Sequence, residues 1–190
     1  MKKLLKIVLI IAILALILPN LWSVIVISIF SMPSEMKKES VCFLAPGLTW
    51  NSTVSDVNNC FGEPVKKGKC NDVTGTVTDT YKIQYENRAV TVRATRRPLA
   101  DIEISDKRGV FYYSFDIDCS DETDEKAVFE KLCNELIDDK GDNKRFRYEK
   151  EDYNEFSAYI DYGACSISYN IKYDIYDGEN EVYFNADAVY

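Results

Sequence analysis

Hydrophobic and polar residues alternate along several stretches of the chain, which is the pattern of β-strands with one buried face. In the segment 110–119 one face carries Phe111, Tyr113, Phe115, Ile117 and Cys119. A Glu86-Asn87 turn separates two earlier strands, at 81–85 and 90–94. Further strand signals lie at 102–104, 144–149, 155–162, 165–175 and 182–188. The pattern predicts antiparallel sheet in both halves of the chain.

Two helices interrupt these strands. In the first, from 53 to 61, Thr53 and Asp56 fit the capping pattern T-x-x-D, and Gly62 followed by Pro64 ends the helix. The Asn51-Ser52-Thr53 sequon is the alternative reading of its start, and the helix explains more positions. The second helix begins with the acids after Ser120 and closes at Lys140-Gly141; its apolar stripe contains Val128, Phe129, Leu132, Cys133, Leu136 and Ile137.

The order of these elements predicts an α+β protein in which helices pack on antiparallel sheet. We expect a cytoplasmic N-terminus at 1–6, a transmembrane anchor at 7–31, a linker at 32–41, a first α+β unit at 42–108 and a second at 109–190. The two units are interpreted as a possible tandem pair, although no residue-level repeat relates them.

The N-terminal anchor is predicted from the absence of any charged residue between Ile7 and Ser34, because a bilayer core needs about 20 apolar residues in a helix. A cleaved signal peptide is the alternative, but its apolar region is shorter and Leu21-Trp22 is a poor processing site. The basic N-terminus favours an inside orientation. The Lys-, Asn- and Tyr-rich composition is typical of a bacterial protein. We therefore expect a single-pass protein of the bacterial cell membrane with its C-terminal part extracytoplasmic.

Cysteine usage agrees with an oxidising compartment. The chain has six cysteines, no CxxC pair and no histidine, which favours disulfides over a metal site. The disulfide candidates are Cys42, Cys60, Cys70, Cys119, Cys133 and Cys165. A bridge between Cys133 and Cys165 is the easiest geometrically, and buried thiols are the alternative.

Composition and charge narrow the function classes. The formal net charge is −8 while residues 1–40 are net positive, so the remaining part is strongly acidic and unsuited to nucleic acid. The chain lacks the nucleophile, phosphate-loop and dinucleotide motifs, and its inward-facing cysteines are poorly activated. We therefore expect neither catalysis nor a cofactor or metal, with weak calcium binding left open.

Tyrosine beside acidic residues is the composition of a protein-recognition surface. Thirteen tyrosines occur, and they concentrate after Tyr148. The predicted binding surface comprises Tyr159, Tyr176, Tyr183, Asp116 and Asp118. Sheet tyrosines with solvated hydroxyls are the alternative interpretation. Arg88, Arg93, Arg96 and Arg97 form a basic cluster in sequence, which would meet an anionic partner or balance nearby acids.

The string STVSDVNNCFGEP resembles the first-helix motif of the BamE/SmpA-like envelope lipoproteins, relatives of the β-lactamase-inhibitor-protein-like folds. The matching positions are Thr53, Val57, Phe61, Gly62 and Pro64, within about residues 49–105. The chain departs from that family at Asn51, where glycine is usual, and in its helical rather than lipid anchor. An outer-membrane assembly role therefore does not transfer.

Together these features favour a membrane-anchored, extracytoplasmic protein-binding or structural module of the cell envelope, whose partner is another envelope protein. The alternative function is inhibition of an envelope or foreign hydrolase, which the same resemblance implies.

Overall fold

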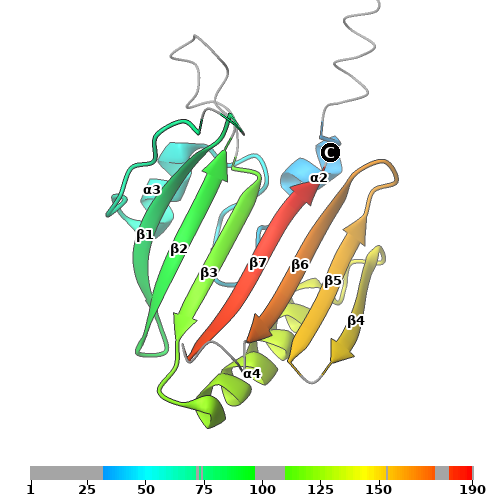
Figure 1. Cartoon of the computed structure of the whole chain (residues 1–190). Helices are drawn as coiled ribbons and strands as arrows, with labels where there is room; N and C mark the ends of the chain where they lie inside the picture. Colours follow the sequence, from blue (N-terminus) through cyan, green and yellow to red (C-terminus); the bar gives the residue numbers. More distant parts are fainter. Residues whose placement is uncertain are drawn as a thin grey trace, which may run out of the picture. The chain divides into compact units, whose positions relative to one another are not determined.

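Seven strands form one antiparallel sheet in the order β1-β2-β3-β7-β6-β5-β4 (Figure 1). The computed structural model describes residues 32–71, 73, 75–96, 110–152, 154–173 and 180–189. The strands are β1 (Val77–Tyr85), β2 (Arg88–Arg96), β3 (Tyr112–Asp118), β4 (Phe146–Asp152), β5 (Glu155–Asp161), β6 (Ser166–Tyr173) and β7 (Glu181–Val189). The described helices are α2 (Ser34–Lys38), α3 (Val54–Phe61) and α4 (Glu122–Lys140).

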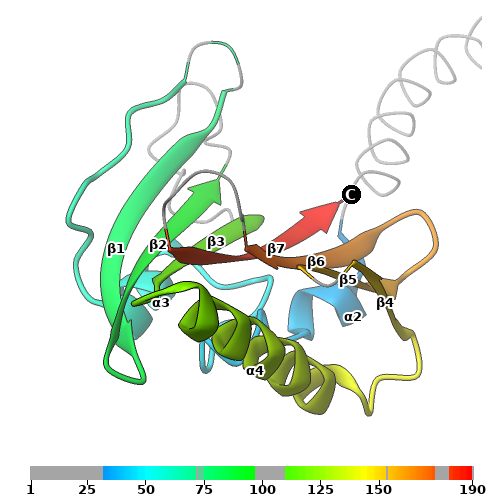
Figure 2. The same ribbon diagram turned by 60° about the horizontal axis from the view of Figure 1, so that its bottom comes forward.

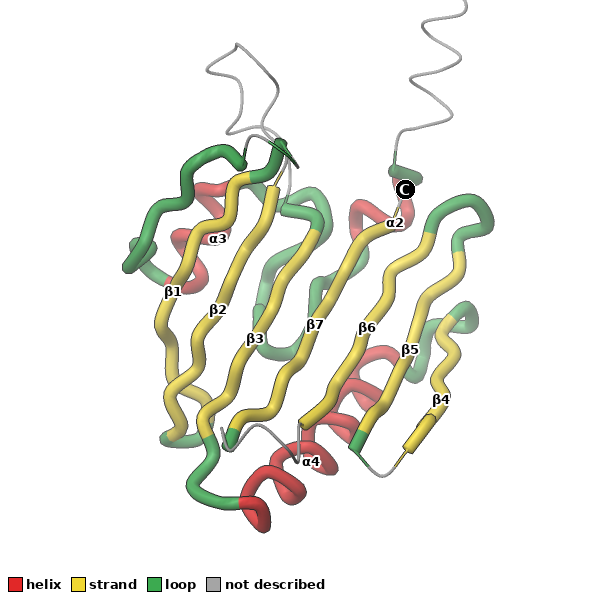
Figure 3. The backbone as a smooth tube through the Cα atoms, in the orientation of Figure 1, coloured by secondary structure: helices red, strands yellow, loops and turns green. Residues whose placement is uncertain are grey.

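The single sheet corrects the predicted fold class. Two tandem α+β units would each need a sheet, whereas the last strand, β7, pairs with the whole length of β3, with Phe115 opposite Phe184. β7 thereby joins the β1–β3 meander to the β4–β6 meander (Figure 3). The described part of the chain is mostly antiparallel sheet with few helices. Alternation assigns a strand to a face but does not select its neighbour, which explains the wrong prediction.

Local signals in the sequence are confirmed. Glu86 and Asn87 form the two-residue β1–β2 turn, both with positive φ (48° and 67°), as hairpins of this length require. At the start of α3 the Thr53 side chain accepts a hydrogen bond from Asp56 N, and the Asp56 carboxylate accepts one from Thr53 N at 2.7 Å. Gly62, with φ of 84°, ends the helix in a conformation that other residues avoid.

All described helices lie on one side of the sheet (Figure 2). Phe61 of α3 packs on Tyr81 of β1 with ring centroids 5.7 Å apart. Phe129 of α4 packs on Tyr173 of β6 at 5.3 Å. Between the helices, residues 40–53 fill the space over β3 and β7, where Trp50 contacts the Tyr113 ring. This covered side is the hydrophobic core, and it includes the tail of the segment interpreted as a linker.

The prediction of a single-pass membrane protein is wrong on the described structure. Among the helices of the residues given above, none is long and apolar enough to cross a membrane. The longest, α4, carries acidic or basic residues in every turn. Residues 7–31, to which the sequence assigns the anchor, lie outside the described residues. The membrane partner, the signal anchor and the extracytoplasmic localisation that rest on this anchor therefore lose their support.

The disulfide prediction is also wrong. None of the six cysteines, all within the described residues, forms a disulfide. Cys42, Cys133 and Cys165 are buried in the core, whereas Cys70 is exposed in the loop before β1. The sequence periodicity correctly predicted that Cys133 and Cys165 point into the core, but it does not determine the distance between their sulfur atoms. Burial raises the pKa of Cys42 to about 12 and that of Cys119 to about 11, so both are thiols at neutral pH.

An ion pair holds α4 to the β1–β2 hairpin. Arg88 donates to both oxygens of Asp124, from Nη2 at 2.5 Å and from Nε at 3.2 Å, and Ser120 N donates to Oδ2 at 3.0 Å. These hydrogen bonds, that of Arg88 above all, lower the pKa of Asp124 from 3.8 to about 2. The Asp124 side chain is 20% exposed, and solvent screening there limits the stabilisation by the ion pair.

Because the pKa of Asp124 is depressed by folding, the stabilisation is present above pH 4 and disappears as the pH falls toward 2. We expect Asp124→Asn to lower the free energy of unfolding by about 1–2 kcal/mol at pH 6, and the deficit to shrink between pH 4 and pH 2. Urea unfolding across this range measures it. Asp118→Asn, at an exposed carboxylate of β3, is the control. A deficit that stays constant with pH would contradict the assignment.

Candidate functional site

The side of the sheet opposite the helices is an open face, formed by the alternate residues that point away from the core (Figure 2). No described helix covers it. Antiparallel sheets often leave one face to solvent, and such a face is normally polar. Its composition and internal contacts therefore decide whether it is more than a solvated surface.

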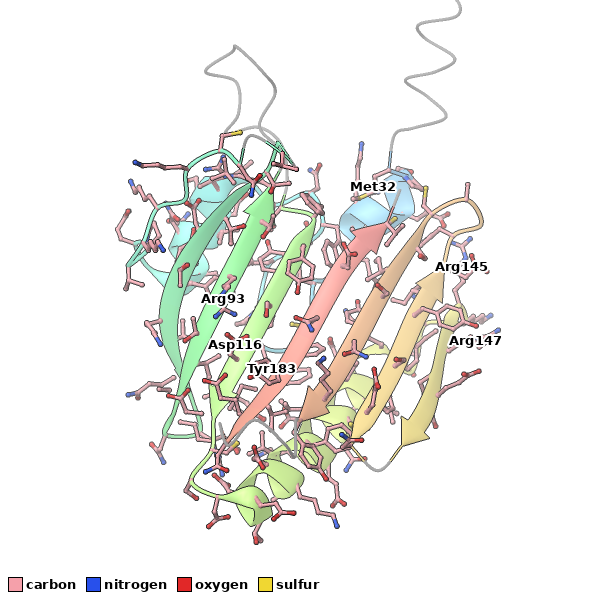
Figure 4. All side chains as sticks on the ribbon, in the orientation of Figure 1. Met32, Arg93, Asp116, Arg145, Arg147 and Tyr183 are labelled. Atoms are coloured by element: carbon pink, nitrogen blue, oxygen red, sulfur yellow. The ribbon has the colours of Figure 1, made fainter. Side chains whose placement is uncertain are left out.

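A buried carboxylate lies at the centre of the open face. Asp116 of β3 is only 3% exposed although it points away from the core (Figure 4). Arg93 of β2 forms an ion pair with it, and Ser114 Oγ donates to its Oδ1 at 3.0 Å. On the other side it is paired in register with Tyr183 of β7. The Arg93 side chain remains 47% exposed, so this pair presents a guanidinium to solvent and keeps the carboxylate beneath it.

Hydrogen bonds between strands connect side chains across the rest of the face. Tyr112 OH donates to Asn185 Oδ1 at 2.8 Å, across β3 and β7. Asn170 Nδ2 of β6 donates to Glu155 Oε1 of β5 at 2.9 Å. These contacts fix the rotamers of groups that a partner would meet, which reduces the conformational entropy lost on binding.

The charge of the open face is predominantly acidic. Its acidic residues are Asp116, Asp118, Glu149, Glu155, Asp161, Glu181 and Asp187, and its basic residues are Lys82, Arg93, Arg147 and Lys172. Arg93 is already neutralised by Asp116. Tyrosine rings stand among these charges, and Tyr159 is 44% exposed. The surface thus combines aromatic rings, fixed amides and an excess of negative charge.

Four of the five residues predicted for a binding surface come together on this face. Tyr159 lies on β5, Tyr183 on β7, and Asp116 and Asp118 on β3. Tyr176 lies outside the described residues. Asp118 is exposed, whereas Asp116 is buried under Arg93 and can act only by positioning that guanidinium.

Sequence reasoning missed Tyr112, Asn185 and Asn170, which complete the hydrogen-bonded part of the face. The sequence pattern could have placed them on the open face, because residues that alternate with core positions in a strand must point outward. The sequence cluster of arginines, in contrast, does not assemble. Arg88 binds Asp124 and Arg96 binds Asp79 at 3.2 Å, while only Arg93 reaches the open face. Arg97 lies outside the described residues.

A pocket of about 350 Å³ lies away from the open face, beside α2. It is lined by Ser34, Lys37, Lys38, Thr49 and Asn51. This lining contains no carboxylate, thiol or histidine that could serve as a general base. Among the described residues, no group of three or more ligand-type side chains is placed to hold a metal ion.

Comparison of the chain with family models, curated proteins and solved structures finds no match. The resemblance of residues 49–105 to the BamE/SmpA-like proteins therefore stays a prediction, as does the inhibitor function that it implies.

Proposed function

We propose that this protein is a non-enzymatic binding module that holds a basic surface of another protein against its open face. The observation that carries the proposal is the preorganised, acidic and tyrosine-bearing face that no described helix covers. Tyrosine supplies contact area at a low entropy cost, and serine and asparagine supply hydrogen bonds. Nucleic acid is a poor ligand for this face, because its phosphates would meet the excess of carboxylates.

Charge complementarity defines the expected partner. Exposed acids such as Asp118 and Asp161 would steer lysine- and arginine-rich surfaces toward the sheet. The exposed ring of Tyr159 offers a flat contact for an arginine side chain. Affinity should therefore weaken with rising salt concentration.

The test is affinity capture with the tagged full-length chain, followed by binding measurements on the captured protein. We expect Asp118→Lys and Tyr159→Ser each to weaken binding by about tenfold. Glu130→Lys, an equal charge change at an exposed position of α4, should leave binding unchanged. A partner whose affinity falls with Glu130→Lys but not with the face variants would contradict the proposal, as would a partner without basic surface.

A further inference from the structure

The two edge strands of the sheet, β1 and β4, differ in whether another segment of the chain pairs with their outer side. At the β1 edge the chain adds its own segment: Lys66 N donates to Thr80 O at 3.3 Å, and Thr80 N donates to Lys66 O at 2.9 Å. Gly68 then passes so close to Thr78 that a Cβ atom would lie 2.2 Å from the Thr78 carbonyl oxygen. The β1 edge is therefore covered around Thr78 and Thr80. At the other edge β4 is the last strand, and no described segment pairs with its outer side (Figure 1).

The alternating direction of the backbone along β4 shows which of its N–H and C=O groups point away from β5, toward a further strand. Asp161 N donates to Arg145 O, so residue 145 directs its backbone toward β5. In an antiparallel ladder the direction alternates, and residues 146, 148 and 150 therefore point outward. Phe146 is already engaged, since its N–H donates to Asn143 O and its carbonyl accepts from Arg147 Nη1 at 2.7 Å. Tyr148 is thus the first outward residue of β4 whose backbone N–H and C=O remain available to another strand.

Most of the charge along this edge is divided by sign. Lys144, Arg145 and Arg147 precede Tyr148, and Glu149, Glu151 and Asp152 follow it, with Lys150 as the one basic residue among them. Two copies paired antiparallel about Tyr148 would place Arg147 opposite Glu149 of the second copy, twice. A two-fold axis centred on residue 147 would place Arg147 opposite Arg147 of the second copy. An axis centred on residue 149 would likewise place two Glu149 side chains opposite each other. The charges therefore select one register, because like charges directly opposite each other destabilise a strand pair.

The aromatic side chains fit the same arrangement. Tyr148 is 52% exposed, although its ring stacks on Phe156 with centroids 5.6 Å apart. At the two-fold axis it would meet Tyr148 of the second copy and continue the aromatic row. An exposed edge strand with an aromatic residue is otherwise a site of uncontrolled association.

We infer that β4 is a homodimerisation edge, which pairs with β4 of a second copy in the register centred on Tyr148. The contact is isologous, so it closes after two subunits and does not propagate. Because the axis is perpendicular to the sheet, both open faces lie on the same side of one continuous sheet. If the proposed function holds, the dimer binds a partner bivalently; the dimer itself does not depend on that function.

Two differently tagged full-length copies test the inference by co-purification. Arg147→Glu and Glu149→Arg each create two like-charged pairs in a homodimer, so co-purification of a variant with itself should fall about tenfold below wild type. When the two variants are mixed, each of the two pairs again contains one acidic and one basic side chain, and co-purification should recover the wild-type level. This recovery is expected when residues 147 and 149 face each other across an antiparallel contact.

Controls separate this contact from other effects. A non-ionic detergent is included because residues 7–34 contain no charged side chain. This segment is present in every sample, so any association through it contributes equally to mixed and same-variant pairs. Circular dichroism checks that each variant folds. The inference is overturned if wild-type copies do not co-purify, or if the mixed pair stays as low as the same-variant pairs.

A second measurement avoids charge changes altogether. In a Cys70→Ser background, which removes the exposed thiol, Tyr148→Cys places two cysteines opposite each other at about 5.5 Å between Cα atoms, within disulfide reach. It should form a dimer on a non-reducing gel. Glu149→Cys, which does not face itself in this register, should not. Equal cross-linking of both variants would overturn the register.

Discussion

Replacing Phe115 by alanine is expected to lower the free energy of unfolding by about 4 kcal/mol, the largest effect of any single change considered for this chain. Phe115 is fully buried on β3. Its ring stacks on Phe184 with centroids 5.7 Å apart and meets the edge of Phe61 of α3 at 6.2 Å. It therefore contacts the strand that joins the two meanders and the helix that covers the first of them.

Guanidinium unfolding of the full-length chain measures this loss as a shift in midpoint at unchanged slope. Phe115→Leu keeps most of the volume and should cost less than about 1.5 kcal/mol. Tyr159→Ala, on the open face, should stay within about 0.5 kcal/mol of wild type. A Phe115→Ala variant as stable as Tyr159→Ala would show that β3 and β7 do not share this core.

Replacing Lys140 by alanine should cost about 3 kcal/mol. Lys140 ends α4 and is 1% exposed. Its ammonium donates to Ser40 O at 2.8 Å and lies 3.6 Å from Glu39 Oε1 and 3.3 Å from Asp139 Oδ2. Truncation leaves a cavity and removes the cation from these oxygens. The expected loss is at the low end for buried ion pairs, because both carboxylates keep about a quarter of their surface exposed.

Two variants divide this effect into its parts. Lys140→Met keeps an aliphatic stem but removes the ammonium, which lies over the Tyr169 ring and donates to Ser40, so it should lose about 1–2 kcal/mol. Lys126→Ala, at an exposed lysine of the same helix, should change stability by less than about 0.5 kcal/mol. The same unfolding assay applies. If Lys140→Ala matched Lys126→Ala, the contact between α4 and the segment before Val41 would not form.

Much of the local structure could be predicted from residue order because its causes are local. The Thr53–Asp56 capping box, the Gly62 helix end and the Glu86-Asn87 turn each depend on a few neighbouring residues. The alternation in β3, β6 and β7 also identified which residues point into the core and which point out. For this reason Tyr183 and Asp118 could be placed on an outward surface from the sequence.

The burial of Asp116 could not be predicted in this way. Its phase on β3 points outward, and its burial depends on neighbours from other strands, among them Arg93 of β2, which forms an ion pair with it. Lys140 is the converse case, since a lysine at a helix end normally reaches solvent. It is buried because residues 39 and 40, a hundred positions earlier in the chain, supply its oxygen partners.

By itself, then, the sequence determined the extent of most helices and strands, the face of each residue and the acidic character of the chain. Tertiary structure alone decided the strand order, the thiol state of the cysteines and the contrast between a β1 edge bridged at Thr80 and an open β4 edge. The physical reason is that alternation encodes a direction, in or out, at every residue. Which strand lies beside which depends on pairing energies between distant segments, and these act only once the chain has folded.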